Sequence, residues 1–309
     1  MSAPTVSVVV CTYSGGRWEE LRAAVRSIER QTYAPLETIV VVDHDDALLA
    51  RVRAELHGVV AVPNDGSRGL SGARNAGVAV ARGDVVAFLD DDAVAAPDWL
   101  QQLSSEYEHE DVLGVGGAIL PVWDVHPRWF PPEFAWVVGC TYRGMPSSRA
   151  AVRNLIGANM SFRRELFAEV GGFLSGVGRI GTRPLGCEET ELCIRARAAR
   201  PEGQFVYQPL ARVDHHVPRR RAGWRYFLAR CYAEGLSKAR VVRESGAAAG
   251  LSAERSYASR TLPRGVLSGL VAAATLRDPA GAVRAIAIVV GLMTTASGFC
   301  AGRLAGVAR

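Results

Sequence analysis

The chain has 309 residues, of which 49% are hydrophobic and 22% charged, so it can bury a sizeable core and is not intrinsically disordered. Its formal net charge of +5 is mild but uneven, because basic residues outnumber acidic ones between Arg212 and Arg264. We expect an anionic partner for the C-terminal third, a membrane surface or a phosphate-bearing substrate, and no nucleic-acid partner.

Strand and helix patterns alternate through the first 92 residues. Apolar, β-branched runs predict buried parallel strands at 6–13, 36–43, 58–63 and 83–92. Helical spacing of apolar residues predicts the helices between them, at 17–31, 46–56 and 69–81. This alternation is typical of an α/β fold with a Rossmann-like, mostly parallel sheet flanked by helices.

Polar residues stand where several of these strands end. In open α/β sheets, ligands bind at the carboxyl ends of the strands. We therefore expect one shared rim for these strand-end residues, which are Thr12, Tyr13, Asp43, Asp90, Asp91 and Asp92.

The regular alternation breaks down after Trp99. The patterns that follow predict strands at 113–123 and 205–216, a strand that runs into a helix at 154–173, and helices at 186–199 and 224–242. Residues 124–136 are rich in proline and aromatic side chains, which predicts a loop. We divide the chain into subdomains 1–117 and 118–240 and a helical tail, 241–309.

The tail contains an apolar stretch, Ala285 to Gly302, of 18 residues without a charge. That length is at the lower limit for crossing a bilayer, so we expect membrane association through a short span or through interfacial helices. A buried helical hairpin is the alternative. The N-terminus has no basic leader and the scattered cysteines have no C-x-x-C spacing. We therefore expect a cytoplasmic protein, at the inner face of the cell membrane.

The three consecutive aspartates repel one another, which favours a bound cation. A strand that ends in D-x-D, here Asp90 to Asp92, supplies the hard oxygen ligands that suit Mn²⁺ or Mg²⁺. The alternative is a solvated acidic corner. Near it, the glycine-rich turn at 69–77 and Arg74 offer an anion site. Asp43 could accept a hydrogen bond from a nucleotide base, or could form a turn or helix cap.

Two further pairs carry candidate chemistry. Glu188 and Glu189 begin a predicted helix, where one could act as a general base or both could compensate the helix dipole. His215 and His216 follow a predicted strand. Either imidazole could complete a metal shell, and the alternative is one exposed and one core histidine.

The order of the motifs resembles the family-2 glycosyltransferases of GT-A fold. The matching segments are VSVVVCTY, VVVD, GARNAG, FLDDD, ANMSFRRELFAEVGGF and EETELCIRA, within residues 5 to 240. The resemblance implies an inverting transferase that moves a sugar from a nucleotide-diphosphate donor, with a UDP-sugar favoured, to a hydroxyl acceptor. It also implies a divalent metal, Mn²⁺ or Mg²⁺.

The resemblance also implies roles for individual residues. Thr12, Tyr13, Asp43, Arg74, Asp90 and Asp91 fall on donor-binding positions, with Asp43 at the base and Asp91 at the ribose. Asp92 falls on the metal-ligand position, with Asp90 and either His215 or His216 as further ligands. The second acid of the family's Glu-Asp pair is the base, which implies Glu189, with Glu188 also a candidate.

Several alternatives stay open. The Glu-Glu pair in place of Glu-Asp leaves room for a non-catalytic sugar-nucleotide-binding scaffold. A sugar-phosphate nucleotidyltransferase would share the sheet, and Gly15, Gly16 and Arg17 faintly imitate its phosphate loop. We expect an acceptor from cell-wall, polysaccharide or glycolipid biosynthesis, and a polyprenyl-linked sugar is one such acceptor. The aromatic residues of 118–173 would either stack on sugars or pack in a lid.

Overall fold

The computed structural model describes residues 3–175, 178, 186–246 and 252–307. The chain forms two compact units. The sheet unit consists of Met1–Leu120, Pro146–Arg183 and Glu188–His215. The helical unit consists of Pro121–Met145, Pro184–Cys187 and His216–Arg309.

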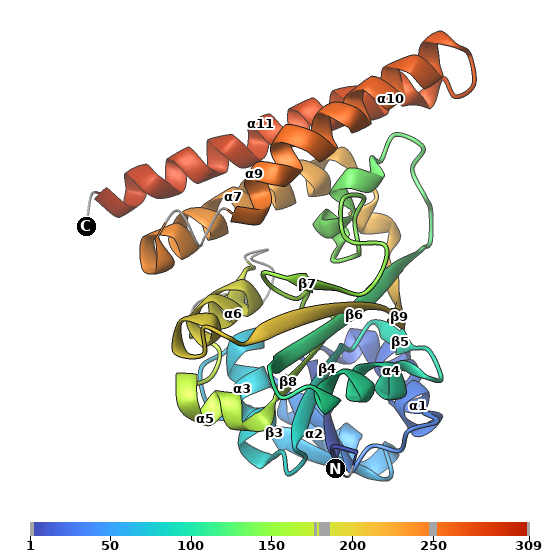
Figure 1. Ribbon diagram of the computed structural model, residues 1–309. Helices are drawn as coiled ribbons and strands as arrows, with labels where there is room; N and C mark the ends of the chain where they lie inside the picture. Colours follow the sequence, from blue (N-terminus) through green and yellow to red (C-terminus); the bar gives the residue numbers. More distant parts are fainter. Residues whose placement is uncertain (1–2, 176–177, 179–185, 247–251, 308–309) are drawn as a thin grey trace. The chain divides into compact units, whose positions relative to one another are not determined.

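Within the described residues, a nine-stranded mixed sheet forms the core of the sheet unit. Its parallel half has the order β3-β2-β1-β4, where the strands are β1 (Val6–Thr12), β2 (Glu37–Val42), β3 (Val59–Pro63) and β4 (Val85–Asp90) (Figure 1). Their β-branched side chains are mostly buried, as expected for strands that are covered on both faces. The predicted strands and the α/β fold class are confirmed.

The other half of the sheet is antiparallel. Beyond β4 the order is β8 (Asn159–Arg163), β6 (Val112–Trp123), β9 (Gln204–Val217) and β5 (Ala93–Ala95), and β7 (Ala150–Val152) also pairs with β9. The sequence patterns predicted β6, β8 and β9. They did not reveal β5 and β7, because three residues are too few to show an alternating pattern.

Helices follow the parallel strands as the sequence predicted. They are α1 (Trp18–Glu29), α2 (Asp46–Glu55) and α3 (Leu70–Val80). Later in the chain, α5 (Arg164–Val170) and α6 (Glu188–Ala199) were also predicted, whereas α4 (Trp99–Ser104) was not. The Asp45 side chain caps α2 by accepting a hydrogen bond from the Leu48 amide at 2.9 Å. Gly77 lets α3 approach the sheet, because a Cβ there would collide with Val9.

The helical unit contains the predicted tail helices. Its elements are the 3-10 segment η3 (Pro132–Val138), α7 (Trp224–Ser245), α9 (Ser252–Ser256), the π-helical turn η5 (Tyr257–Thr261), α10 (Leu262–Ala274) and α11 (Ala280–Val307). Part of the predicted 124–136 loop is therefore η3. In the described part of the chain, one helix is long and apolar enough to cross a membrane, Ala280–Ala305, with a mean hydropathy of 1.8.

The aromatic side chains of residues 123–136 pack against one another and against α7. Trp129 stacks on Trp224 with ring centroids 4.2 Å apart, and Trp123 lies edge-on to Phe130 at 5.0 Å. Trp136 donates a hydrogen bond to the Tyr257 hydroxyl at 3.1 Å. These contacts fit the interpretation that the aromatic residues pack against one another rather than stack on sugars.

Candidate active site

The aspartate cluster meets His215 through the pairing of two strands. Asp90 is the last residue of β4, and Asp92 directly precedes β5. The first residue of β5, Ala93, pairs with His215 of β9. One ligand atom from each of Asp90, Asp92 and His215 therefore lies within 4.8 Å of the others. This register joins residues that are far apart in the sequence.

The two neighbouring histidines have different partners. His215 is buried, and its Nε2 lies 3.1 Å from Asp92 Oδ1. His216 Nε2 lies 2.8 Å from Asp124 Oδ1. The separation follows from the strand, because successive side chains of β9 point to opposite faces. The sequence left both histidines open as metal ligands, and the geometry favours His215.

The group formed by Asp90, Asp92 and His215 has the chemistry of a divalent-cation site. Two carboxylates and one imidazole suit Mn²⁺ or Mg²⁺. Asp92 and His215 are buried, and Asp90 is partly buried. Burial of two carboxylates so close together is costly unless a cation compensates them. These residues therefore fit a bound metal ion.

Arg17 also binds the aspartate cluster, which the sequence did not predict. It ends a short 3-10 turn, η1 (Gly15–Arg17), that follows β1. Its Nη1 lies 2.7 Å from Asp91 Oδ1 and 3.3 Å from Asp92 Oδ2. Burial raises the pKa of Asp91 to about 6, although the Arg17 guanidinium acts in the opposite direction. The position of Arg17 just past a strand end was the signal that could have identified it.

Arg74 lies in the centre of the site and contacts three segments. It is 2% exposed, and its Nη1 lies 2.9 Å from Glu188 Oε1. Its Nη2 donates a hydrogen bond to the Gly157 carbonyl at 3.1 Å and lies 3.7 Å from Asp90 Oδ1. Burial alone would lower the pKa of Arg74, but the negative groups around it, of which Glu188 and Asp90 contribute most, together outweigh burial and the pKa is raised. Arg74 therefore stays charged between the aspartates and the start of α6.

The two candidate bases differ in their surroundings. Glu188 is buried, and its Oε1 accepts from Arg74. Its Oε2 has no hydrogen-bond partner among the residues described. Glu189, the next residue of α6, is only partly buried. The structure therefore places Glu188 in a fixed ion pair and leaves Glu189 closer to solvent.

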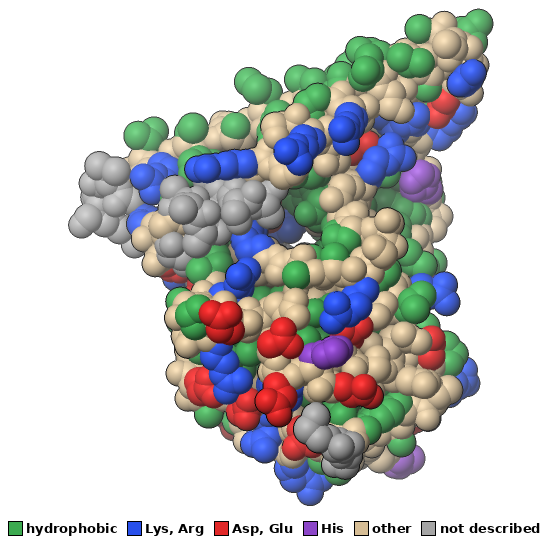
Figure 2. Space-filling model, viewed as in Figure 1, with side chains coloured by type: hydrophobic (Ala, Val, Ile, Leu, Met, Phe, Trp, Pro, Cys, Tyr) green, Lys and Arg blue, Asp and Glu red, His purple; other side chains and the backbone are tan. Residues whose placement is uncertain are grey.

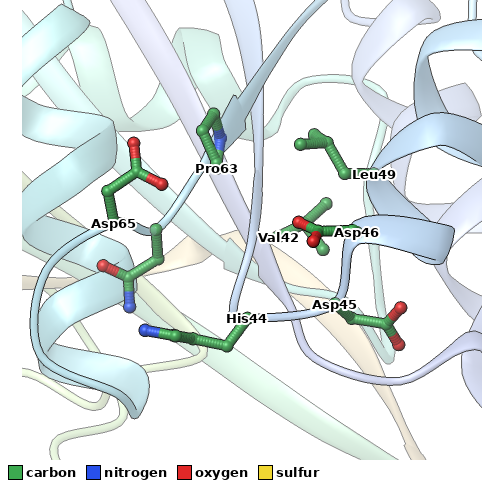
Figure 3. A pocket seen from close by; sticks show the side chains of 8 residues that line it. Val42, His44, Asp45, Asp46, Leu49, Pro63 and Asp65 are labelled. Atoms are coloured by element: carbon green, nitrogen blue, oxygen red, sulfur yellow. The ribbon is translucent and has the colours of Figure 1, made fainter.

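Asp43 lies at the end of β2, beside a pocket. Its Oδ1 accepts from Asn64 Nδ2 at 2.6 Å, and its Oδ2 accepts from the Gly69 amide at 3.0 Å. The adjacent pocket has a volume of about 240 Å³ and lies between the loops after β2 and β3 (Figure 3). It is lined by Val42, His44, Asp45, Asp46, Leu49, Pro63, Asn64 and Asp65.

The strand-end residues of β1 lie in the same region of the sheet. Thr12 is buried, and its carbonyl accepts a hydrogen bond from the Asp43 amide at 2.8 Å. The Arg17 guanidinium lies over the Tyr13 ring, 5.2 Å from its centroid. Contacts therefore link β1 both to the Asp43 loop and, through Arg17, to the aspartates.

The fold defines a glycosyltransferase of GT-A type. Residues 7–171 match the family described as Glycosyl transferase family 2. The glucosyl-dolichyl phosphate glucuronosyltransferase of Haloferax volcanii is 41% identical over 238 residues, which are 75% of this chain and 76% of that protein. The chain belongs to glycosyl transferase family 2, and the resemblance seen in the sequence is confirmed.

Other relatives are more distant. The succinoglycan biosynthesis protein ExoM of Rhizobium meliloti is 26% identical over 77% of this chain and 75% of its own. The mannosyltransferase PcManGT from Pyrobaculum calidifontis, solved with GDP-Man and Mn²⁺, has a TM-score of 0.61 and 20% identity, with 96% of this chain and 88% of that chain covered. GalNAc-T7, solved with UDP, GalNAc and Mn²⁺, has a TM-score of 0.53 and 20% identity, with 70% and 44% covered. Both structures share the fold.

Proposed function

We propose that the protein is an inverting glycosyltransferase that moves a glucuronosyl residue from a UDP-sugar to a hydroxyl of a polyprenyl-linked saccharide. The observation that carries the proposal is the grouping of Asp90, Asp92 and His215 on the strand-end rim. The name of the Haloferax volcanii relative, which is 41% identical, supports the sugar and the lipid-linked acceptor. The solved relatives bound to Mn²⁺ support the metal.

In this proposal Asp90, Asp92 and His215 would hold a divalent cation. Such a cation, when bound, would stabilise the negative charge that develops on the leaving diphosphate. The positively charged Arg74 lies close to Asp90 and holds the Glu188 carboxylate in place through an ion pair. The pocket next to Asp43, whose walls are the loops after β2 and β3, would receive the nucleotide base.

We assign the general base to Glu189. Glu188 is committed to Arg74 and is buried, so it would have to break an ion pair before it could accept a proton. Glu189 is more exposed and starts the same helix. A carboxylate there would take the proton of the acceptor hydroxyl as this attacks the anomeric carbon from the face opposite the diphosphate. One displacement then inverts the configuration.

We also propose that the protein acts at the inner face of the cell membrane. Large apolar side chains are exposed along α10 and α11, among them Leu267, Leu270, Ile286, Val289 and Met293 (Figure 2). Exposed arginines, including Arg260 and Arg264, lie in the same segment. A stripe of this kind fits the surface of an anionic bilayer, where a lipid-linked acceptor would lie.

The packing of α11 favours an orientation along the membrane surface over a span. A Cβ added at Gly298 would collide with the Tyr232 carbonyl, and one at Gly302 would press on Ala239, so α11 and α7 lie backbone to backbone. A spanning α11 would carry α7 with it. That would place the charged side chains of α7, such as Arg240 and Glu244, in hydrocarbon, which is costly.

A product assay tests the activity. The purified protein would be given UDP-glucuronic acid, Mn²⁺ and a glucosyl polyprenyl phosphate, and the products would be analysed by mass spectrometry and NMR. We expect UDP release, a lipid-linked product enlarged by one hexuronic acid residue, and an inverted anomeric configuration. Release of pyrophosphate would indicate a nucleotidyltransferase instead. Absence of turnover with any nucleotide sugar would contradict the proposal and favour a binding scaffold.

A further inference from the structure

We propose that Arg17 makes the binding of the divalent cation and of the donor diphosphate depend on each other. This inference rests on the proposed function, since it takes Asp92 as a ligand of the cation. Arg17 is close enough to act on that ligand: its guanidinium is 3.3 Å from Asp92 Oδ2 and 2.7 Å from Asp91 Oδ1. It belongs to the loop between β1 and α1 and lies outside the cation group itself.

The Asp92 carboxylate contacts both His215 and Arg17. Its Oδ1 lies 3.1 Å from His215 Nε2, on the side of the cation group, and its Oδ2 lies 3.3 Å from the Arg17 guanidinium. A divalent cation at Asp92 would therefore lie near a permanent positive charge in a buried setting. The Arg17 side chain is only 12% exposed, so solvent screens the repulsion poorly. Without a donor, Arg17 must weaken cation binding.

A nucleotide diphosphate reverses this effect. Its oxygens bring negative charge that can bind both the cation and a guanidinium, and arginine binds phosphate through two parallel hydrogen bonds. The long Arg17 side chain extends from the short turn η1 past the Tyr13 ring. For the coupling to arise, this side chain has to rotate from the aspartates towards the diphosphate. Repulsion becomes attraction when both ligands are present, and such coupling is reciprocal.

A structural role for Arg17 predicts different results. If Arg17 only neutralised the buried Asp91, its removal would lower protein stability and leave the relation between metal and nucleotide unchanged. Coupling is therefore the quantity that separates the two interpretations. It is measured as the ratio of the Mn²⁺ affinities with and without UDP, and it does not require turnover.

The test is a Mn²⁺ titration by isothermal calorimetry, with and without saturating UDP, on the wild-type protein and the variants R17Q, R17K and R22Q. We expect UDP to tighten Mn²⁺ binding to the wild type by about tenfold or more. R17Q should bind Mn²⁺ alone about tenfold more tightly than the wild type. UDP should then tighten Mn²⁺ binding to R17Q by less than in the wild type, because only the direct attraction between the diphosphate and the cation remains. R17K keeps the charge and should keep most of the coupling. R22Q is the matched control, because Arg22 lies in α1, which directly follows Arg17, and pairs only with the exposed Glu19 among the described residues.

Each result bears on one part of the proposal. If folded R17Q showed the wild-type ratio, the role of Arg17 would be overturned while the proposed function stood. If the wild type bound no Mn²⁺ even with UDP, the cation site would be overturned and this inference with it. Circular dichroism and thermal unfolding would establish that each variant is folded, and R17M, which also removes the charge, provides the test if R17Q is not folded.

Discussion

The Arg74 guanidinium lies 2.9 Å from Glu188 Oε1, and both side chains are almost fully buried. The ion pair joins α3 to the first residue of α6, across 114 positions of sequence. The acidic start of α6 therefore has a fixed position relative to the aspartate rim, where Arg74 also contacts Asp90.

Removal of the Arg74 charge should destabilise the protein. In R74M, Glu188 would remain as an uncompensated buried carboxylate, and we expect a loss of about 3 kcal/mol in the free energy of unfolding. The double variant R74M/E188M should recover much of that loss but no transferase activity. Urea unfolding and a turnover assay measure both effects. A loss in R74M no larger than in R82M, where the exposed Arg82 pairs with Glu37, would contradict the assignment.

The two acids of α6 should respond differently to amide substitution. E189Q should lower kcat by about 10²- to 10⁴-fold, because it removes the proton acceptor, and should cost less stability than E188Q, because Glu189 is only partly buried. E188Q should lower stability, because it breaks the pair with Arg74. Steady-state kinetics and thermal unfolding of both variants provide the comparison. If E188Q lost turnover and E189Q kept it, the base would be Glu188.

The cation site should depend on one histidine of the pair. H215Q should weaken Mn²⁺ binding at least about tenfold, since it removes a ligand beside Asp92. H216Q is the matched control and should bind Mn²⁺ as the wild type does, because its ring lies against Asp124. Electron paramagnetic resonance of free Mn²⁺ reports both. Equal losses of Mn²⁺ affinity in H215Q and H216Q would contradict the assignment of His215 alone as the histidine ligand.

Asp84 should make a small contribution to stability that disappears in acid. Its Oδ2 accepts hydrogen bonds from the Thr5 hydroxyl at 2.7 Å and the Thr5 amide at 2.9 Å, and these lower the pKa of Asp84. The stabilisation is therefore complete above the ordinary pKa of aspartate and is lost as the pH falls through the lowered value. D84N should cost less than about 1 kcal/mol at pH 7, because the group is largely exposed, and nothing at pH 2. Urea unfolding at the two pH values tests this, and a cost that persists at pH 2 would contradict it.

The apolar face of the tail helices should bind lipid. The variant I286D/M293D should lose co-sedimentation with anionic phosphatidylglycerol vesicles, while its turnover of a soluble acceptor analogue stays normal. L210D is a suitable control, because Leu210 is an equally exposed apolar residue of the sheet unit.

Proteolysis of right-side-out membrane vesicles should leave the tail uncut, because a protein at the inner face of the membrane is enclosed in such vesicles. Vesicle binding by I286D/M293D at the wild-type level would argue that this face does not contact the membrane.

Patterns within single segments predicted much of the fold and of the rim. The β-branched runs located β1 to β4, and the strand ends identified Asp43 and Asp90 to Asp92 as a group. Local patterns could not show contacts that depend on register. The pairing of Ala93 with His215 decides which histidine meets Asp92, and the sequence does not state it. Arg17 was missed for the same reason, since 74 positions separate it from Asp91.

The short strand β5 has a consequence for the synthesis of the protein. Asp90 and Asp92 leave the ribosome early, but His215 reaches them only when β9 has been made and paired with β5. An emerging chain, or a fragment that ends before β9, would therefore contain the aspartates without the group. The group also depends on a long-range strand pairing, which is typically slow to form. The three residues therefore come together only after β5 and β9 have paired. A partly synthesised chain that lacks β9 cannot bind an ion through Asp90, Asp92 and His215 together.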